Sequence, residues 1–547
     1  MYKQKSIVLI TLLLTTGIFA LAQQTDSVKL ALKDELTRSM KELKLENHEP
    51  PFYISYGLND MEYTTIAATL GALMQSDVRP NRTKNVRVMV GDYEFNDESL
   101  DARYYQADYN PGDWMVPLNN DYWTIRASYW ETTDNIYKNA AKIYKEHIQY
   151  LEDKDKAIDS IPHRRFAKTE KVVYSADLTL PEMDLEKLED KVRQASAYFL
   201  DYKEIEASGV IFNNNKTKSY FINSEGSDIF QKRNITSLTI TARTTTEDGY
   251  PVFDYKTMIA STPEELPGLD SIQKEISSLV NHLEKIKTTP SFEDSYEGPV
   301  LFLDNAVPFL FGQIVGQFTT SDIPDQDGND FNYSPVRSLD EKMGDRIISK
   351  YLSIRLTPKL TSYNGQPLYG AYKFDSEGVT PADEIVLVAN GEVKNVMTSR
   401  TLTKAHHIAN GTADGPGVIH VDYHGENETL ASLKSKLLEL VDEDGLEYGI
   451  IIKSVKNRQM VNVYKLYPDG TEEFFRTARI GNINNNTLRK VAGAMKSKKV
   501  HTIYGNMAAG INASFIVPEG ILLKNVEVQA NRMGNKSEDP LVNNPVN

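Results

Sequence analysis

The sequence predicts an α+β protein of two lobes, in which the N-terminal lobe mixes helices and sheet and the C-terminal lobe is rich in antiparallel strands. Three observations lead to this prediction. A chain of 547 residues is too long for a single hydrophobic core. Helical apolar periodicity alternates with strand patterns in the first half, whereas short strands and turn signals dominate the second. The change falls within residues 287–297, where Thr288-Thr289-Pro290 breaks a helix.

The first 22 residues are typical of a secretory signal peptide. Lys3 and Lys5 precede an apolar run at residues 7–14, and Ala20-Leu21-Ala22 ends the segment in a cleavage pattern. We therefore expect an exported protein, periplasmic or otherwise extracytoplasmic. No later segment approaches the length needed to span a membrane, so we expect no membrane insertion.

Composition argues against a disulfide-stabilised protein and against a nucleic-acid-binding protein. The chain contains no cysteine, so disulfides cannot stabilise it even in an oxidising compartment. Its formal net charge is −15, and cleavage after residue 22 would remove two lysines and change the net charge to −17. An acidic chain without a basic cluster does not suit nucleic acid, which selects for patches of Lys and Arg.

We divide the chain into five parts on these patterns. They are the signal peptide (1–22), an N-terminal domain (23–170), the central part of the N-terminal lobe (171–292), a C-terminal domain (293–533) and a flexible tail (534–547).

The first half alternates helices with strands. Apolar residues at helical spacing predict helices over residues 28–43, 129–151, 185–199 and 272–286. Strand patterns occur at residues 52–58, 86–90, 210–212, 219–222 and 238–242. The polar run Asn213–Thr217 predicts a hairpin turn between two of these strands. Residues 158–171 are interpreted as a linker.

The stretch Gly298–Phe318 organises the second half. It predicts a buried strand at Val300–Leu303, a turn, and a helix that carries Phe311–Gln317. Residues 320–338 follow, rich in Asp, Asn, Gly and Pro, and predict a mobile loop.

Further strands and one helix complete the C-terminal half. Asn390-Gly391 lies between two apolar runs, at 385–389 and 392–397, and is the strongest short signal for a β-hairpin. A helix is predicted over 430–440 and a strand over 448–455. A final apolar strand follows Pro518-Glu519-Gly520.

Several of these pieces resemble the TldD/PmbA family of metallopeptidases, the "modulator of DNA gyrase" group. The resemblance is carried by Gly298–Phe318, the turn Phe374–Val379, the Asn390-Gly391 hairpin and the closing strand, and is densest from residue 299 to 526. It implies a C-terminal lobe built around a helix that bears His-Glu-x-x-x-His in active members. In those members the two histidines bind zinc, the glutamate is the general base, and a cysteine near the C-terminus is the third ligand.

The zinc motif is degenerate in this chain, which therefore resembles the PmbA/TldE-like members. The matching positions are Gly312, Gln313 and Gln317, and Tyr504 is the nearest counterpart of the cysteine. Glycine has no side chain, and a glutamine amide neither ionises nor ligates zinc well. We expect no catalytic residue, no zinc and no other cofactor. Whether the chain is an enzyme stays open, with no activity expected of it alone.

The spacing of the motif requires a distorted helix. Two positions five residues apart lie about 140° apart on a regular helix, so they share a metal only if the helix is locally widened or broken. Gly316 would permit such a distortion.

A group of histidines offers a rival site. His406, His407, His420 and His424 fall within nineteen residues, and Asp422 lies between the last two. Neutral imidazoles so spaced could bind a transition metal. The alternative is that they are solvated residues beside the flexible loop 410–417. Asp375 and Glu377 are interpreted as turn residues rather than an acid–base pair.

The resemblance favours one function over two others. We expect a subunit without zinc that pairs with an active TldD-like metallopeptidase and helps it to enclose unfolded peptides, held by strand addition. The partner would also be exported, and the chain would meet it through an apolar face near residues 305–318 or the Asn390-Gly391 hairpin. The alternatives are an active metallopeptidase with unrecognised ligands and a stand-alone peptide-binding protein.

Overall fold

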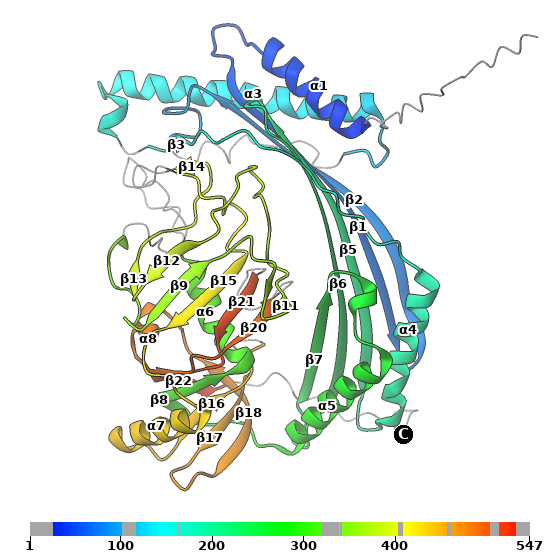
Figure 1. Cartoon of the computed structure of the whole chain (residues 1–547), viewed down its shortest axis with the longest axis vertical. Coiled ribbons are helices and arrows are strands. Elements are labelled where there is room, and N and C mark those ends of the chain that lie inside the picture. The colour runs from blue at the N-terminus through cyan, green and yellow to red at the C-terminus, as the bar shows by residue number, and fades with distance from the viewer. Residues whose placement is uncertain are drawn as a thin grey trace, which may run out of the picture.

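The computed structural model (Figure 1) describes residues 26–100, 116–161, 163–318, 339, 342–402, 408–456, 461–503, 513–531 and 536. The predicted signal peptide and the predicted loop at 320–338 lie outside these residues, as does the predicted tail apart from Lys536. Within them, no helix is long and apolar enough to cross a membrane. The fold is α+β, as predicted.

One sheet of long, curved strands forms the N-terminal half and bends around the rest of the molecule (Figure 1). Its order is β2-β1-β5-β6, and both β4 and β7 pair with β6. All of its pairings are antiparallel except that of β4 with β6. The strands are β1 (Pro51–Thr69), β2 (Ala72–Val90), β4 (Val173–Ser175), β5 (Ala207–Asn223), β6 (Asp228–Thr245) and β7 (Pro251–Ala260).

Two pairs of helices cover this sheet at its two ends (Figure 1). They are α1 (Ser27–Glu42), α3 (Tyr122–Asp153), α4 (Leu185–Ala197) and α5 (Leu269–Thr288), and all four were predicted. Asp26 starts α1, since its carboxylate accepts hydrogen bonds from the N–H groups of Val28 and Lys29. One core packs α1 and α3 against the end of the sheet where β1 begins and β2 ends. A second core packs α4 and α5 against the other end, where β1 ends and β5 begins.

The predicted hairpin at Asn213–Thr217 is wrong. These residues lie in the middle of β5, which pairs with β1 on one side and with β6 on the other. The buried amide of Asn214 donates to Asn234 Oδ1 at 3.0 Å and accepts from the Thr236 hydroxyl at 2.5 Å. Polar side chains therefore find partners across the sheet, and the continuous ladder overrides the local turn preference.

Two six-stranded sheets form the C-terminal half. The first has the order β13-β12-β9-β15-β21-β20 and the second β18-β17-β16-β8-β22-β19. The first consists of β9 (Leu352–Leu356), β12 (Ile385–Ala389), β13 (Glu392–Val393), β15 (Val418–Tyr423), β20 (Lys498–Ile503) and β21 (Ala513–Pro518). The second consists of β8 (Ser295–Leu303), β16 (Gly449–Ile452), β17 (Val461–Leu466), β18 (Glu472–Ile480), β19 (Val491–Ala494) and β22 (Gly520–Ala530).

Helix α6 (Val307–Val315) belongs to the core that the two C-terminal sheets share. Its residues are buried except for Gln313, which is half-buried. On the other face of the second sheet, α7 (Leu430–Glu443) packs Leu433 and Leu437 against β8 and β16. A short helix, α8 (Asn485–Arg489), precedes β19. Because α6 buries its apolar side chains in this core, it cannot supply the apolar partner face that we expected near residues 305–318.

The segment predicted as a linker joins the two halves instead. It contains β3 (Arg165–Phe166), which pairs with β14 (Thr401–Leu402). Next to this pair, the fully buried Arg400 donates to the carbonyl of Ala167 at 2.6 Å and to Glu225 Oε1 at 2.7 Å. The N-terminal sheet and the C-terminal half are thus connected by hydrogen bonds far apart in the sequence.

The predicted Asn390-Gly391 hairpin is confirmed. Asn390 and Gly391 have φ of 49° and 84°, and Ala389 pairs with Glu392 across this two-residue turn. A second hairpin of the same kind has Asn364-Gly365 (φ 49° and 77°) between β10 (Ser362–Tyr363) and β11 (Gln366–Pro367). A Cβ on Gly391 would lie 2.5 Å from the carbonyl oxygen of Ile348, whereas one on Gly365 would meet nothing within 4 Å.

The two turns allow a matched test of close packing. Gly365→Ala should lower the free energy of unfolding by about 1–2 kcal/mol, the cost of a left-handed conformation for an L-residue. Gly391→Ala should cost about 1–3 kcal/mol more, because its Cβ would also clash with backbone. Denaturant unfolding of both variants measures the difference. Equal losses would show that the backbone around Gly391 can move aside.

Candidate functional site

Two positions of the degenerate motif, Gly312 and Gln313, lie on α6, and the third, Gln317, lies in the turn just after it. Gly312 is buried, and Gln313 and Gln317 are half-buried. The Gln317 amide donates to the carbonyl of Gln313 at 3.3 Å, and its oxygen accepts from Asn485 Nδ2 at 3.5 Å. The chain after Val315 tightens, because the N–H groups of Gln317 and Phe318 bond three residues back. The regular helix therefore ends at Val315, and the distortion expected near Gly316 is a break with a tighter turn and not a widening.

The residues of α6 do not fit a zinc site. Gly312 offers no donor atom, and the amides of Gln313 and Gln317 are poor zinc ligands. No group of three or more His, Asp or Glu in the described residues could hold a metal ion. Tyr504, the counterpart of the third ligand, lies outside the described residues.

Restoring the motif provides a prediction. The triple substitution Gly312→His, Gln313→Glu and Gln317→His should bind well below one zinc per chain and cleave no unfolded peptide. The third ligand would be missing, and the first imidazole would enter a packed core. Elemental analysis and a peptide-cleavage assay are the measurements, with the unsubstituted chain as control. Strong cleavage that a chelator abolishes would show that a third ligand is already in place.

The histidines of the rival site do not form one cluster in the described residues. His420 is buried in β15, and its ring packs edge-on against Tyr363 with 5.4 Å between ring centroids. Burial lowers the pKa of His420 to about 4. His424 lies beyond the strand, where its Nε2 is 2.8 Å from the hydroxyl of Ser353. Asp422 between them pairs with Arg355 and Lys498. His406 and His407 lie outside the described residues.

Asp375 and Glu377 lie in the turn that carries part of the resemblance. The carboxylate of Asp375 accepts hydrogen bonds from the N–H groups of Val379 (2.8 Å), Glu377 (3.1 Å) and Ala413 (3.2 Å). Glu377 pairs with Arg87 at 2.6 Å, which connects this turn to β2. Both residues thus have structural partners, in keeping with their interpretation as turn residues.

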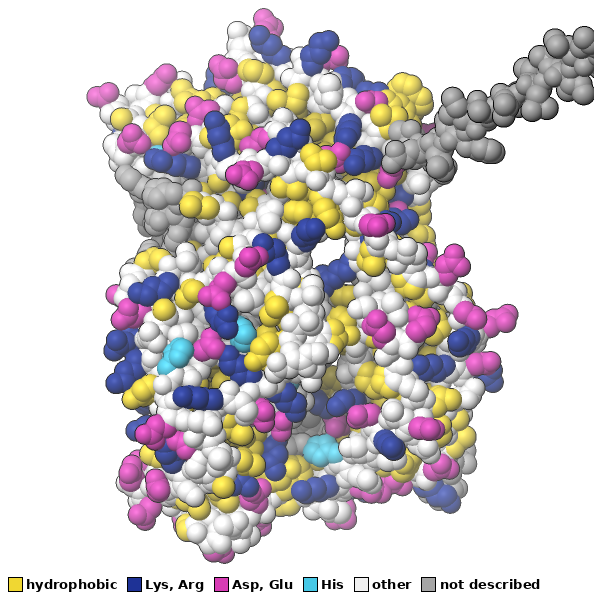
Figure 2. Space-filling model, viewed as in Figure 1, with side chains coloured by type: hydrophobic (Ala, Val, Ile, Leu, Met, Phe, Trp, Pro, Cys, Tyr) yellow, Lys and Arg dark blue, Asp and Glu magenta, His cyan; other side chains and the backbone are white. Residues whose placement is uncertain are grey.

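A cavity of about 600 Å³ lies elsewhere, between the N-terminal sheet and the C-terminal half. Figure 2 shows the surface hollowed between these two halves. The cavity is lined by β7 and α5 on one side and by β17, β18, β20 and the loop after β16 on the other. The turn before α6 contributes Asn305, and the start of α6 contributes Pro308 and Phe309. The degenerate motif, further along α6, is not part of the lining.

Two edge strands face this cavity. In the described part of the chain, β7 pairs only with β6, and β20 pairs only with β21. Residues 252–257 of β7 and 500–503 of β20 line the cavity. An edge strand presents unpaired N–H and C=O groups, so each strand can accept another extended chain.

The backbone of Tyr255 on β7 is already satisfied by side chains. Its N–H donates to Asp254 Oδ1 at 2.8 Å, and its C=O accepts from Lys456 Nζ at 2.7 Å. Lys456 and Asp254 also form an ion pair. These contacts show that the backbone of Tyr255 points away from β6. In an antiparallel ladder this direction alternates, so Phe253 and Thr257 also direct their backbone groups outward.

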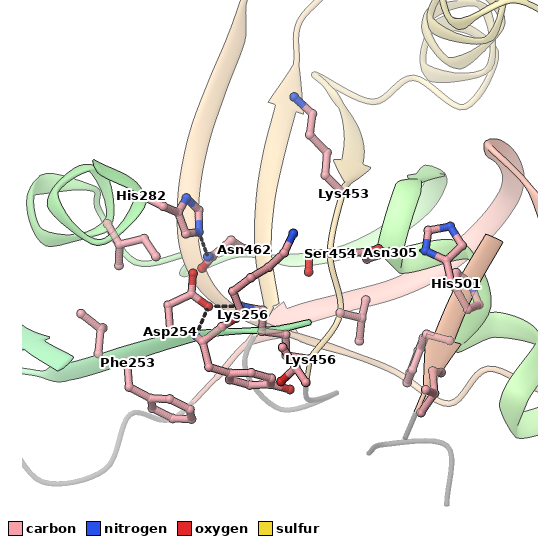
Figure 3. Close-up of a pocket in the computed structure, with 18 of the residues that line it drawn as sticks. Phe253, Asp254, Lys256, His282, Asn305, Lys453, Ser454, Lys456, Asn462 and His501 are labelled. Atoms are coloured by element: carbon pink, nitrogen blue, oxygen red, sulfur yellow. Dashed lines mark hydrogen bonds and ion pairs between the residues drawn. The ribbon is translucent and has the colours of Figure 1, made fainter. Parts of the chain in front are cut away.

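Two histidines lie on opposite sides of the cavity (Figure 3). His501 Nδ1 is 2.9 Å from Asn305 Oδ1, and burial lowers the pKa of His501 to about 4. His282 on α5 has Nε2 at 3.5 Å from Asn462 Nδ2, and its pKa is also lowered by burial. Both imidazoles are therefore neutral near pH 7, and they add no positive charge to the cavity.

Thr477 marks backbone strain in the cavity wall. It has φ of 61°, although it is β-branched and buried. Residues 476 and 477 of β18 oppose the single residue 462 of β17, so Thr477 belongs to a β-bulge. Residues held in such conformations cost of order 1–3 kcal/mol and concentrate at functional sites.

Sequence reasoning missed this cavity. Its charged residues are Asp254, Lys256, Lys453 and Lys456, and none belongs to a recognisable motif. The lining combines segments from residues 252 to 503, which only the folded chain brings together. The strand pattern at residues 252–260 could have indicated one wall of the cavity, but we predicted no strand there. The described lining residues include no nucleophile–base pair, and they offer strand edges, apolar walls and lysine amines.

Comparison with known protein families matches two regions of the chain. The model for the PmbA/TldA metallopeptidase C-terminal domain matches residues 295–528, and that for the central domain matches residues 178–266. No curated protein sequence matches the chain.

Solved structures share the fold. A Thermotoga maritima protein described as a candidate modulator of a DNA gyrase has a TM-score of 0.53 and 14% identity, over 87% of this chain and 96% of its own. TldE from Thermococcus kodakarensis has a TM-score of 0.51 and 14% identity, over 91% and 100%. A Bacteroides thetaiotaomicron protein, also described as a candidate modulator of DNA gyrase, has a TM-score of 0.55 and 13% identity, over 92% and 99%.

Proposed function

This chain belongs to the PmbA/TldD family of metallopeptidase-related proteins, and we propose that it acts there as a non-catalytic subunit. It would pair with an active TldD-like metallopeptidase and help to hold unfolded peptides for cleavage. The observation that carries the proposal is the cavity with a strand edge on either side, β7 and β20, that no other described strand pairs with.

Strand addition explains how such a cavity could hold peptides of many sequences. A peptide laid along β7 would pair with outward-facing backbone, at Phe253 and Thr257 for example, and backbone groups are common to every sequence. At Tyr255 the peptide would compete with the Asp254–Lys456 pair, which already uses the N–H and C=O groups. Apolar side chains of the cavity wall, such as Tyr464 and Phe474, would contact the side chains of the peptide.

The absence of zinc donors on α6 supports a non-catalytic role. In active members, as the resemblance implies, this helix carries two ligands and the general base. Here Gly312, Gln313 and Gln317 occupy those positions. A subunit of this kind would complete the enclosure around a peptide without taking part in bond cleavage.

A partner subunit follows from this role. One of the structural neighbours is named TldE, and the signal-like residues 1–22 suggest that the partner is exported too. Near the Asn390-Gly391 hairpin, Met343 and Tyr351 are 42% and 40% exposed. These isolated side chains do not make the extended apolar face that we expected, so we propose an interface of mixed polarity around them.

Co-expression tests the proposal. The chain should co-elute in size-exclusion chromatography with an exported relative from the same genome that retains His-Glu-x-x-x-His. The pair should cleave an unfolded peptide faster than the relative alone. Separate elution at micromolar concentrations, with this chain a stable monomer that binds peptide, would favour the stand-alone peptide-binding protein. That alternative rests on the same cavity, which a single chain forms.

A further inference from the structure

The charges around the cavity are unlike those of the whole protein. The chain carries a formal net charge of −15, yet the cavity lining has three lysines and a single acidic residue. The acidic residue, Asp254, is paired with Lys456, which also donates to the carbonyl of Tyr255. Lys456 is therefore engaged, and Lys256 and Lys453 remain as the amines to consider.

Among the described residues, each of these amines is held only by one long ion pair. The nearest carboxylate to Lys256 Nζ is that of Glu275, at 3.7 Å, and the nearest to Lys453 Nζ is that of Glu472, also at 3.7 Å. These separations are too long for a direct hydrogen bond. Glu472 is in addition bonded to Lys434, so its charge is shared.

The positions of the two lysines suit a ligand on the edge of β7. Lys256 is on β7 itself, and Lys453 is in the loop after β16, where its amine lies 3.9 Å from the centroid of the Tyr464 ring. Figure 3 shows Lys256 in the space between His282 and His501, with Lys453 above it in this view. Both side chains are exposed enough for a ligand in the cavity to reach their amines.

We propose that this cavity selects extended peptides that present a carboxylate, which Lys256 and Lys453 bind while the backbone pairs with β7. The inference rests on the peptide binding proposed above and adds a substrate class to it. The carboxylate has two possible sources, an aspartate or glutamate side chain and the C-terminus of a peptide. In both cases the carboxylate accepts charge-assisted hydrogen bonds from amines that are held only by long ion pairs in the described structure.

Matched peptides provide the experiment. An end-capped fluorescent peptide as long as β7, with one central Glu, is compared with the same peptide carrying Gln, by anisotropy on the full chain. The Glu peptide should bind about tenfold more tightly, equivalent to 1.4 kcal/mol. A third peptide, with Gln and a free C-terminus, tests the other source of the carboxylate. Added salt should weaken binding of the carboxylate peptides more than that of the neutral peptide.

Variants then test whether Lys256 and Lys453 cause the preference for carboxylate peptides. Lys256 and Lys453 are 51% and 43% exposed, so Lys256→Met with Lys453→Met should leave the fold intact. This double variant should bind the carboxylate and neutral peptides alike. Lys142→Met is the matched control, because Lys142 is an exposed lysine on α3, outside the cavity. It should keep the tenfold preference.

The possible failures are distinguishable. If the unaltered chain binds carboxylate and neutral peptides equally, this inference is overturned while the proposed peptide binding stands. If the preference exists but survives the double variant, the assignment to Lys256 and Lys453 is overturned. If no peptide binds, both proposals fail.

Discussion

Replacing Arg400 with methionine is expected to lower the free energy of unfolding by about 3–5 kcal/mol, the usual cost of removing one partner of a buried ion pair. Arg400 is fully buried, and its guanidinium bonds to Ala167, Glu225 and the hydroxyl of Tyr53. It also lies 4.0 Å from the ring centroid of Phe166. Methionine would fill much of the space and leave the Glu225 carboxylate and the Ala167 carbonyl without this donor.

The test is a shift in the denaturant midpoint, together with limited proteolysis. Because Arg400 connects the N-terminal sheet to the C-terminal half, cleavage between the halves should become faster. Arg346→Met is the control, since Arg346 is 56% exposed and its contact with Glu392 is 3.4 Å long. Exposed pairs contribute about 0–1 kcal/mol. A loss of similar size in both variants would show that the contacts of Arg400 are dispensable.

The second large effect concerns pH. Burial, as the main cause, raises the pKa of Asp375 from its ordinary value of 3.8 to about 7. The unfolded chain releases this proton at lower pH than the folded chain, so the folded state binds more protons between about pH 4 and pH 7. The contribution of Asp375 to the free energy of unfolding therefore falls as pH rises through this window. Its total size is about 4 kcal/mol, and the loss is complete above about pH 7.

Asp375→Asn isolates this contribution from those of other titrating groups. Asparagine cannot ionise, so the variant should gain stability relative to the unaltered chain as pH rises from about 5 to about 8. Urea unfolding across this range gives the difference. Asp383→Asn is the control, since Asp383 is 93% exposed, and its difference from the unaltered chain should stay nearly constant. If the difference in unfolding free energy between Asp375→Asn and the unaltered chain does not change with pH, the Asp375 carboxyl is ionised throughout this range.

Local sequence patterns were enough to predict the segments that form their backbone hydrogen bonds within themselves. The helices α1, α3, α4, α5 and α7 follow from apolar residues at helical spacing, since a helix bonds within itself. The Asn390-Gly391 hairpin follows from two residues that tolerate positive φ. The lack of zinc donors at Gly312, Gln313 and Gln317 is likewise a matter of residue identity.

Local patterns failed where the partner of a segment is distant in the sequence. Asn213–Thr217 looks like a turn, yet it is mid-strand because β1 and β6 pair with both of its edges. Residues 165–166, predicted in a linker, form β3 because Thr401 and Leu402 lie beside them. Strand pairing is made between separate segments, so the sequence of one strand does not contain its register or its neighbours.

The sequence by itself determined that this chain is α+β, has no cysteine and lacks the side chains of a zinc peptidase on α6. Only the tertiary structure decided where a ligand could bind. The cavity lies at the start of α6, between the edges of β7 and β20, and its lysines come from a strand and a loop almost two hundred residues apart. The physical reason is that edges, cavities and the charges around them arise from long-range packing, which no local sequence pattern records.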